Sequence, residues 1–257
     1  MKNKIILNIP HSSLKLSKEF IKKKKLLNTN EIEKFNLQMT DLFTDKLFSF
    51  KKFSHIKAKC SRICCDVEKF VDDRKEVMAQ FGLGVIYKND LNKRKIFLNL
   101  DKAYQDEILN KYYFPYHKKL DHIVGNCLKK QKVILIDCHS FSKEIVMDDA
   151  LKNNLPDICI GYAPKFCSNE LMDFVCQYFK SNRYSVQINY PYFGTMVLDF
   201  LFEKADANFQ SVMIEINRKI YLTKNRRNKN YNILKKQLKM LLKKLQYFKL
   251  QQSNSKN

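Results

Sequence analysis

Two histidines stand where an apolar, strand-like run of the sequence gives way to polar residues. His11 follows the run from Lys4 to Ile9, and His139 follows the run from Lys132 to Asp137. Imidazole nitrogen is a common zinc ligand, and a catalytic zinc ion typically takes three protein ligands and keeps one position open. A single histidine of this kind is more often structural, but two of them favour a metal site that a carboxylate would complete.

Two aspartates offer that carboxylate. Asp41 and Asp45 are four residues apart in a stretch with a helical pattern, so we expect both on one face of a helix. Either could then serve as the third metal ligand. The alternative is a helix face that points to solvent, and the sequence leaves it open.

A third acidic residue, Glu215, stands inside the apolar run from Val212 to Ile216. An isolated buried carboxylate is costly, so such a group must be paired, bound to a metal or protonated. Beside a metal ion, a carboxylate is well suited to take a proton from water. The alternative is a structural ion pair between Glu215 and Arg218 or Arg62.

The elements that would position these residues alternate along the chain. Six short apolar runs predict strands at Lys4–Ile9, Ser54–Ala58, Lys132–Asp137, Ile158–Tyr162, Tyr184–Asn189 and Ser211–Ile216. Longer amphipathic stretches predict helices at about 30–50, 103–129, 168–181 and 228–250. This alternation indicates an α/β fold with a mixed, mainly parallel sheet, in which ligands bind beyond the carboxyl ends of the strands.

The composition of the 257-residue chain, 45% hydrophobic and 29% charged, is that of a globular protein. We expect a single domain over residues 1–250, including a basic C-terminal helix at about 228–250, and a disordered tail over 251–257. No apolar run approaches the roughly 20 residues that span a bilayer. The apolar run near the N-terminus is too short for a signal peptide, so we expect a cytoplasmic protein without membrane contact.

The charge is strongly positive, with 48 Lys and Arg against 26 Asp and Glu and a net charge of +22. Such a field attracts polyanions, and a nucleic-acid-binding protein that uses the basic C-terminal helix is the alternative of another class. That helix, however, has an apolar stripe for packing, made by Leu234, Leu238, Leu241, Leu245 and Phe248. We therefore expect no specific nucleic-acid partner.

A set of motifs in chain order resembles the N-formylglutamate amidohydrolases (N-formylglutamate deformylases). The motifs are IPHSS, TDLFTDKLF, CSRICCDVEKFVDD, GLGVIY, YYFPYHKKL, LIDCHSF, LPDICIG, INYPYFG and QSVMIEINRKIYL. None of them is decisive alone, but the ordered set is specific and ends near Tyr221.

This resemblance implies a three-layer αβα sandwich similar to zinc-dependent exopeptidases. It also implies hydrolysis of the formyl amide of N-formyl-L-glutamate to formate and L-glutamate, a step of histidine degradation. The cofactor would be Zn²⁺, with another divalent metal as the alternative. His11 and His139 would be metal ligands and Asp41 the third, with Asp45 in reserve. Related exopeptidases have a glutamate three residues after the first histidine, where this chain has Leu14.

The remaining roles follow from the same resemblance and from substrate charge. Asp137 could orient the imidazole of His139, and Glu215 would be the catalytic base. A dianionic substrate calls for arginine, which makes fork-shaped contacts to carboxylates. The candidate substrate-binding residues are Arg62, Arg218, Asn217 and His117, of which His117 could instead cap a helix.

Two departures from the family pattern concern the substrate. Lys69 stands where family members often have arginine, and Ser13 stands in a glycine position. Both leave the identity of the small anionic N-acyl amino acid open. The alternative within enzymes is a metal-dependent carboxypeptidase or deacylase of another N-acyl amino acid or small peptide. The sequence leaves the oligomeric state open.

Overall fold

The computed structural model describes residues 2–146 and 149–249, so the tail predicted at 251–257 lies outside the described residues. Within them the chain forms two compact units. Unit 1 contains residues 2–9, 43–56 and 120–249, and unit 2 contains residues 10–42 and 57–119. The single domain expected over residues 1–250 stays a prediction.

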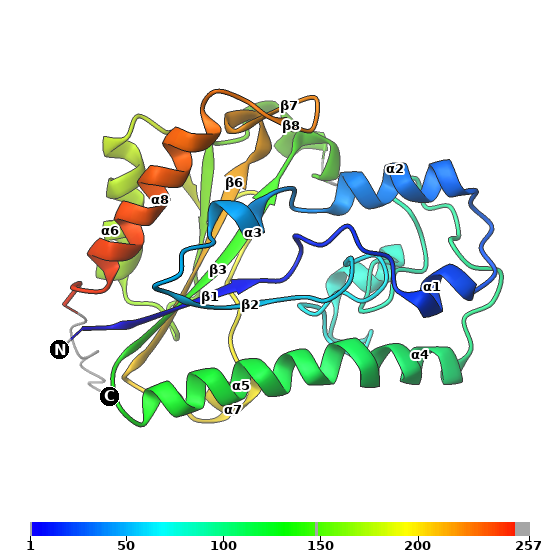
Figure 1. The fold of residues 1–257 in the computed structure, drawn as a ribbon, viewed down its shortest axis with the longest axis horizontal. Helices are drawn as coiled ribbons and strands as arrows, with labels where there is room; N and C mark the ends of the chain where they lie inside the picture. Colours follow the sequence, from blue (N-terminus) through cyan, green and yellow to red (C-terminus); the bar gives the residue numbers. More distant parts are fainter. Residues whose placement is uncertain (1, 147–148, 250–257) are drawn as a thin grey trace. The chain divides into compact units, whose positions relative to one another are not determined.

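Unit 1 is built on a six-stranded sheet with the order β2-β1-β3-β6-β4-β5 (Figure 1). Its strands are β1 (Lys4–Ile9), β2 (Ser54–Lys57), β3 (Val133–Phe141), β4 (Ile158–Gly161), β5 (Val186–Ile188) and β6 (Phe209–Asn217). The pairs β1–β3, β3–β6 and β4–β5 are parallel, whereas β4 and β6 are antiparallel. All six predicted strands and the mixed, mainly parallel sheet of an α/β fold are confirmed.

The register of the sheet aligns several polar side chains in the middle of the strands. Glu215 on β6 is paired with His139 on β3 and with Cys159 on β4. Asn8 on β1 is paired with Asp137 on β3. Because side chains alternate along a strand and paired residues share a face, all five lie on one face of the sheet. His139 lies inside β3, so the expectation that it follows the strand was wrong.

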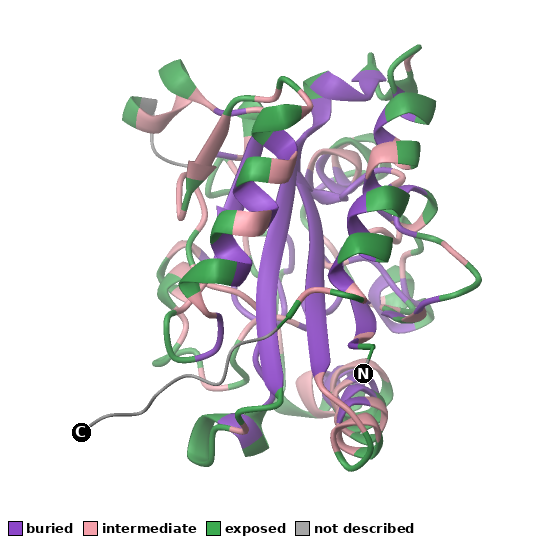
Figure 2. Ribbon diagram, turned by 90° about the vertical axis from the view of Figure 1, so that its left-hand side faces the viewer, coloured by how far each residue is buried: buried purple, intermediate pink, exposed green. Residues whose placement is uncertain are grey.

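The helices of unit 1 pack through apolar faces. They are α3 (Thr44–Leu47), α6 (Asn169–Ser181), α7 (Asp199–Glu203) and α8 (Tyr231–Leu245). Figures 1 and 2 show α6 and α8 running along the sheet. The four leucines of the stripe predicted for α8 are fully buried, whereas its last member, Phe248, lies after the end of α8 and is partly exposed. Short 3₁₀ helices occupy Lys143–Ile145, Asp149–Asn154 and Arg218–Ile220, and a small hairpin joins β7 (Leu222–Thr223) to β8 (Arg226–Arg227).

Unit 2 is mostly helix and loop. It contains α1 (Lys18–Lys22), α2 (Thr29–Met39), a 3₁₀ helix (Val77–Phe81), α4 (Lys102–Ile108) and a π-helical turn (Leu109–Tyr113). The turn leads into α5 (Phe114–Leu128), which ends in unit 1. The run from α4 to α5 is continuous and agrees with the helix predicted over 103–129.

The prediction of one continuous helix over 30–50 was wrong, because two helices occupy this stretch. α2 ends at Met39 and α3 begins at Thr44. The hydroxyl of Thr40 donates to the backbone carbonyl of Asn36 at 2.8 Å, and Phe43 has a left-handed φ of 65° that a helix cannot continue. Asp41 therefore lies between two helices in unit 2, whereas Asp45 belongs to α3 in unit 1. The two carboxylates do not share a helix face.

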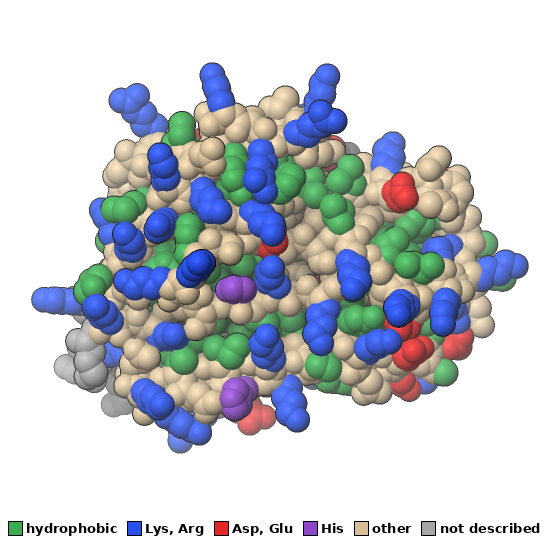
Figure 3. Space-filling view, in the orientation of Figure 1, with side chains coloured by type: hydrophobic (Ala, Val, Ile, Leu, Met, Phe, Trp, Pro, Cys, Tyr) green, Lys and Arg blue, Asp and Glu red, His purple; other side chains and the backbone are tan. Residues whose placement is uncertain are grey.

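The surface carries the charge that the composition predicts. Figure 3 shows Lys and Arg side chains distributed over the visible face, with few acidic side chains among them. Within residues 2–146 and 149–249, none of the helices has the length and apolar character that a bilayer crossing requires.

Candidate active site

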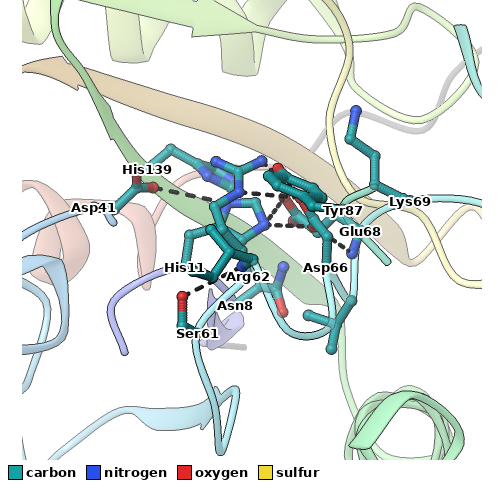
Figure 4. Close-up of polar contacts among 12 residues, drawn as sticks. Asn8, His11, Asp41, Ser61, Arg62, Asp66, Glu68, Lys69, Tyr87 and His139 are labelled. Carbon is teal, nitrogen blue, oxygen red and sulfur yellow. Dashed lines mark hydrogen bonds and ion pairs between the residues drawn. The ribbon is translucent and has the colours of Figure 1, made fainter. Parts of the chain in front are cut away.

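Unit 2 contains a buried histidine–carboxylate cluster (Figure 4). His11 lies two residues after β1, and its Nε2 atom is 2.8 Å from Asp66 Oδ1 and 3.5 Å from Glu68 Oε2. On the other side of the ring, Nδ1 is 3.9 Å from Asp41 Oδ2. The backbone amide of Asp41 also donates to the carbonyl of His11 at 2.9 Å. Three carboxylates therefore face this imidazole.

Asp66 is the most strongly held of these carboxylates. Its Oδ2 atom accepts two hydrogen bonds from Arg62, at 3.0 and 2.8 Å, and one from the Tyr87 hydroxyl at 2.8 Å. Burial opposes ionisation of Asp66, but the attraction of Arg62 and His11 outweighs it and holds the pKa of Asp66 well below its usual range. Asp66 is therefore a fixed anion beside His11, and it engages Nε and Nη2 of Arg62.

The distance between Glu68 and His11 suits two ligands of one metal ion better than it suits a hydrogen bond. Two ligands bound at about 2.0–2.2 Å in a tetrahedral arrangement lie roughly 3.4 Å apart. The 3.5 Å between His11 Nε2 and Glu68 Oε2 agrees with two ligands of one ion, whereas the 2.8 Å to Asp66 is a hydrogen-bond distance. The cluster of unit 2 thus offers one imidazole and one carboxylate to a metal ion.

Unit 1 contains a second buried histidine with the same chemical pattern. Nε2 of the buried His139 lies 2.9 Å from Asp137 Oδ1. Asp137 is itself fixed, because Asn8 Nδ2 donates to its Oδ1 atom and the Met196 amide donates to its Oδ2 atom, each at 2.8 Å. A carboxylate that orients an imidazole in this way is typical of metal-binding histidines.

Glu215 lies on β6, and Arg218 lies in the 3₁₀ turn that follows β6. Glu215 is buried in β6, paired in register with His139. Arg218 is also buried, and its guanidinium donates to the hydroxyl and the carbonyl of Ser140 at 3.3 and 3.2 Å. The side-chain Nδ2 of Asn217 donates to the carbonyl of Pro156 at 3.0 Å, and its Oδ1 accepts from the backbone amide of Lys219 at 3.2 Å. The Asn217 side chain therefore holds the turn after β6.

Two other predicted site residues have local partners. His117 lies inside the continuous helical run, with Nε2 2.8 Å from the carbonyl of Val67 and its ring against Tyr113. It therefore does not cap a helix. Asp45 pairs with the neighbouring Lys46 at 3.5 Å.

Sequence reasoning missed Asp66, Glu68 and Tyr87. The sequence held a signal for the first two. In the stretch CDVEK, Asp66 comes four residues after Arg62, and Glu68 comes two residues after Asp66. An arginine four residues before an aspartate could have suggested their ion pair. Tyr87 has no such local signal, because its contact with Asp66 joins positions 21 residues apart.

Comparisons with known proteins agree on one family. The family model for N-formylglutamate amidohydrolase matches residues 3–222. The crystal structure of N-formylglutamate amidohydrolase from Ralstonia eutropha JMP134 is similar with a TM-score of 0.80 and 22% identity, over 96% of this chain and 94% of that one. A protein of Agrobacterium tumefaciens is similar with a TM-score of 0.68 and 18% identity, over 95% and 92% of the two chains.

A search of curated proteins found no match. The two solved structures confirm the α/β fold. The family model covers most of the sequence, from β1 to the turn after β6. The chain belongs to the N-formylglutamate amidohydrolase family.

Proposed function

We propose that this protein is a metal-dependent amidohydrolase that cleaves the formyl amide of N-formyl-L-glutamate to formate and L-glutamate. Family membership supports an enzyme that hydrolyses an amide. The observation that carries the proposal is that each unit buries one histidine against a fixed carboxylate, His11 with Asp66 and His139 with Asp137. The family resemblance extends the proposal to histidine degradation in the cytoplasm.

In this proposal His11, Glu68 and His139 supply the ligands of one divalent ion. We replace Asp41 with Glu68 as the carboxylate ligand, and Asp41 is the alternative. When bound, Zn²⁺ or another divalent ion would polarise the formyl carbonyl and lower the pKa of a water molecule. Asp137, which lies at Nε2 of His139, would keep that imidazole ring oriented through this nitrogen.

The protein's own residues then handle the proton and the charges of the substrate. Glu215 takes a proton from the attacking water as the water oxygen bonds to the formyl carbon. It returns that proton to the amide nitrogen as the carbon–nitrogen bond breaks, which releases formate and the free amine of glutamate. Arg218 and Arg62 carry positive charge for the two substrate carboxylates.

The test is formate release from a panel of N-formyl amino acids, combined with the metal content of the purified protein. We expect about one ion per chain and fastest release from N-formyl-L-glutamate, and we expect His11→Ala to lose both metal and activity. His122→Ala, which changes an exposed histidine on α5, is the matched control. Full activity of His11→Ala would contradict the proposal. Preference for another N-acyl amino acid would favour the alternative deacylase.

A further inference from the structure

A strap, defined as residues 189–196, follows β5 and folds back over the sheet of unit 1. Asn189 anchors its first part, because its side-chain oxygen accepts hydrogen bonds from the amides of Tyr162 at 2.9 Å and Gly194 at 3.2 Å. Its side-chain amide donates to the carbonyl of Tyr162 at 3.1 Å. These bonds fix the start of the strap to the end of β4.

The strap then contacts β6 and β3 in turn. Thr195 Oγ1 lies 2.8 Å from Ser211 Oγ on β6. The amide of Met196 donates to Asp137 Oδ2 on β3 at 2.8 Å. Residues an even number of positions apart on a strand share a face. Ser211 is four residues before Glu215 and Asp137 is two residues before His139, so the strap lies on the face of the sheet that carries Glu215 and His139.

The approach of the strap to β4 is close. A Cβ atom on Gly161 would lie 2.2 Å from the carbonyl oxygen of Gly194, so a side chain at position 161 would displace the strap. The thiol of Cys159 also donates to the carbonyl of Tyr192 at 3.3 Å. Burial, together with the nearby Glu215 carboxylate, raises the pKa of this thiol to about 12, so it stays protonated and can donate.

Tyr192 is the strap residue that extends across β6. Its carbonyl contacts Cys159 on β4, whereas its ring packs edge-on against Phe141 on β3, with 5.7 Å between ring centroids. β6 lies between β4 and β3 in the sheet, and Glu215 on β6 is paired with Cys159. Phe141 is paired with Asn217, so the Tyr192 side chain crosses β6 between the level of Glu215 and that of Asn217.

We propose that Tyr192 sets the upper size limit for the acyl group of the substrate. The inference rests on the proposed function, in which Glu215 takes a proton from the water that attacks the acyl carbon. That carbon must then be bound near Glu215, and the group attached to it meets the Tyr192 ring. A formyl carbon carries only hydrogen, whereas an acetyl carbon carries a methyl group that a fixed ring would exclude.

The test measures kcat/KM for N-formyl, N-acetyl and N-propionyl derivatives of the preferred amino acid. Truncation of the ring in Tyr192→Ala should raise the ratio of N-acetyl to N-formyl hydrolysis about tenfold or more, within the range that one methyl group is worth in a pocket. Tyr192→Phe keeps the ring and should keep the wild-type ratio. Tyr247→Ala removes an exposed aromatic ring at the end of α8 and is the matched control.

The outcomes separate the two proposals. If the wild type cleaves N-formyl-L-glutamate but Tyr192→Ala keeps its acyl ratio, the role of Tyr192 is overturned and the proposed function stands. If Tyr192→Ala does not fold, Tyr192→Leu is read in its place, with a smaller rise expected. If the wild type cleaves no N-acyl amino acid of the panel, the proposed function is wrong and the inference falls with it.

Discussion

At the scale of single residues, Glu215 has to be separated from the groups that only hold the site together. Gln keeps the shape of the side chain but cannot accept the proton of water. We predict that Glu215→Gln lowers kcat by roughly 10²–10⁴-fold, the usual effect of losing a general base. Metal content and KM should change little, and both are measured on the same preparation.

The control for this prediction is Arg218→Lys, which keeps the charge and loses the fork-shaped contact. A contact to substrate that is equally strong in the ground state and the transition state affects KM and not kcat. If the contact of Arg218 is of this kind, Arg218→Lys should raise KM more than it lowers kcat. Loss of metal from Glu215→Gln would instead make Glu215 a ligand. A lower melting temperature with unchanged kcat would make it a structural residue.

The residues around His11 show what sequence reasoning could reach. His11 was identified from its place after an apolar run, which is a local pattern. Asp66 was not, because its importance comes from contacts with His11 and Tyr87, which are 55 and 21 residues away along the chain. The spacing of Asp41 and Asp45 predicts a shared helix face, and the break before α3 removes that argument. Patterns within one strand were informative, whereas ion-pair partners required the folded chain.

At the scale of elements, Glu19 ties α1 to the π-helical turn of unit 2. Lys111 and the Tyr112 hydroxyl both donate to its carboxylate, the latter at 2.8 Å. Burial opposes ionisation, but these hydrogen bonds outweigh it and lower the pKa of Glu19 from 4.5 to about 2. A lowered carboxyl pKa stabilises the fold above pH 4.5, and that stability is lost as the pH falls from 4.5 to 2.

We therefore predict that Glu19→Gln lowers the free energy of unfolding at neutral pH by at most about 3 kcal/mol. The difference from the wild type should shrink as the pH falls below 4.5. Urea unfolding at a series of pH values measures it, and Glu33→Gln, which changes an exposed glutamate on α2, is the control. A difference that stays constant from pH 7 to pH 3 would contradict the assigned role.

The elements themselves were largely predictable, and the exceptions have physical reasons. β3 and β6 are buried along their whole length, so their apolar runs were clear in the sequence. The π-helical turn at Leu109–Tyr113 did not disturb the helical pattern, so one long helix was a good description. The division into two units was not predictable, because each unit gathers segments that are far apart in the sequence.

At the scale of the whole molecule, the net charge of +22 predicts weak attraction to any polyanion. We expect binding to duplex DNA or RNA without sequence preference, with an affinity that falls steeply between 50 and 200 mM salt as counterions are released. Fluorescence anisotropy with two unrelated oligonucleotides measures it. Tight binding to one sequence that persists at high salt would instead support the nucleic-acid-binding alternative.

The central claim is that the hydrolysis depends on a metal ion, and metal titration into chelator-stripped wild-type protein tests it most directly. Formate release from N-formyl-L-glutamate is followed as Zn²⁺, and separately Mn²⁺ or Co²⁺, is added back. The account predicts no release from the stripped protein and recovery that saturates at about one ion per chain. Full formate release by stripped protein with no detectable metal would contradict it.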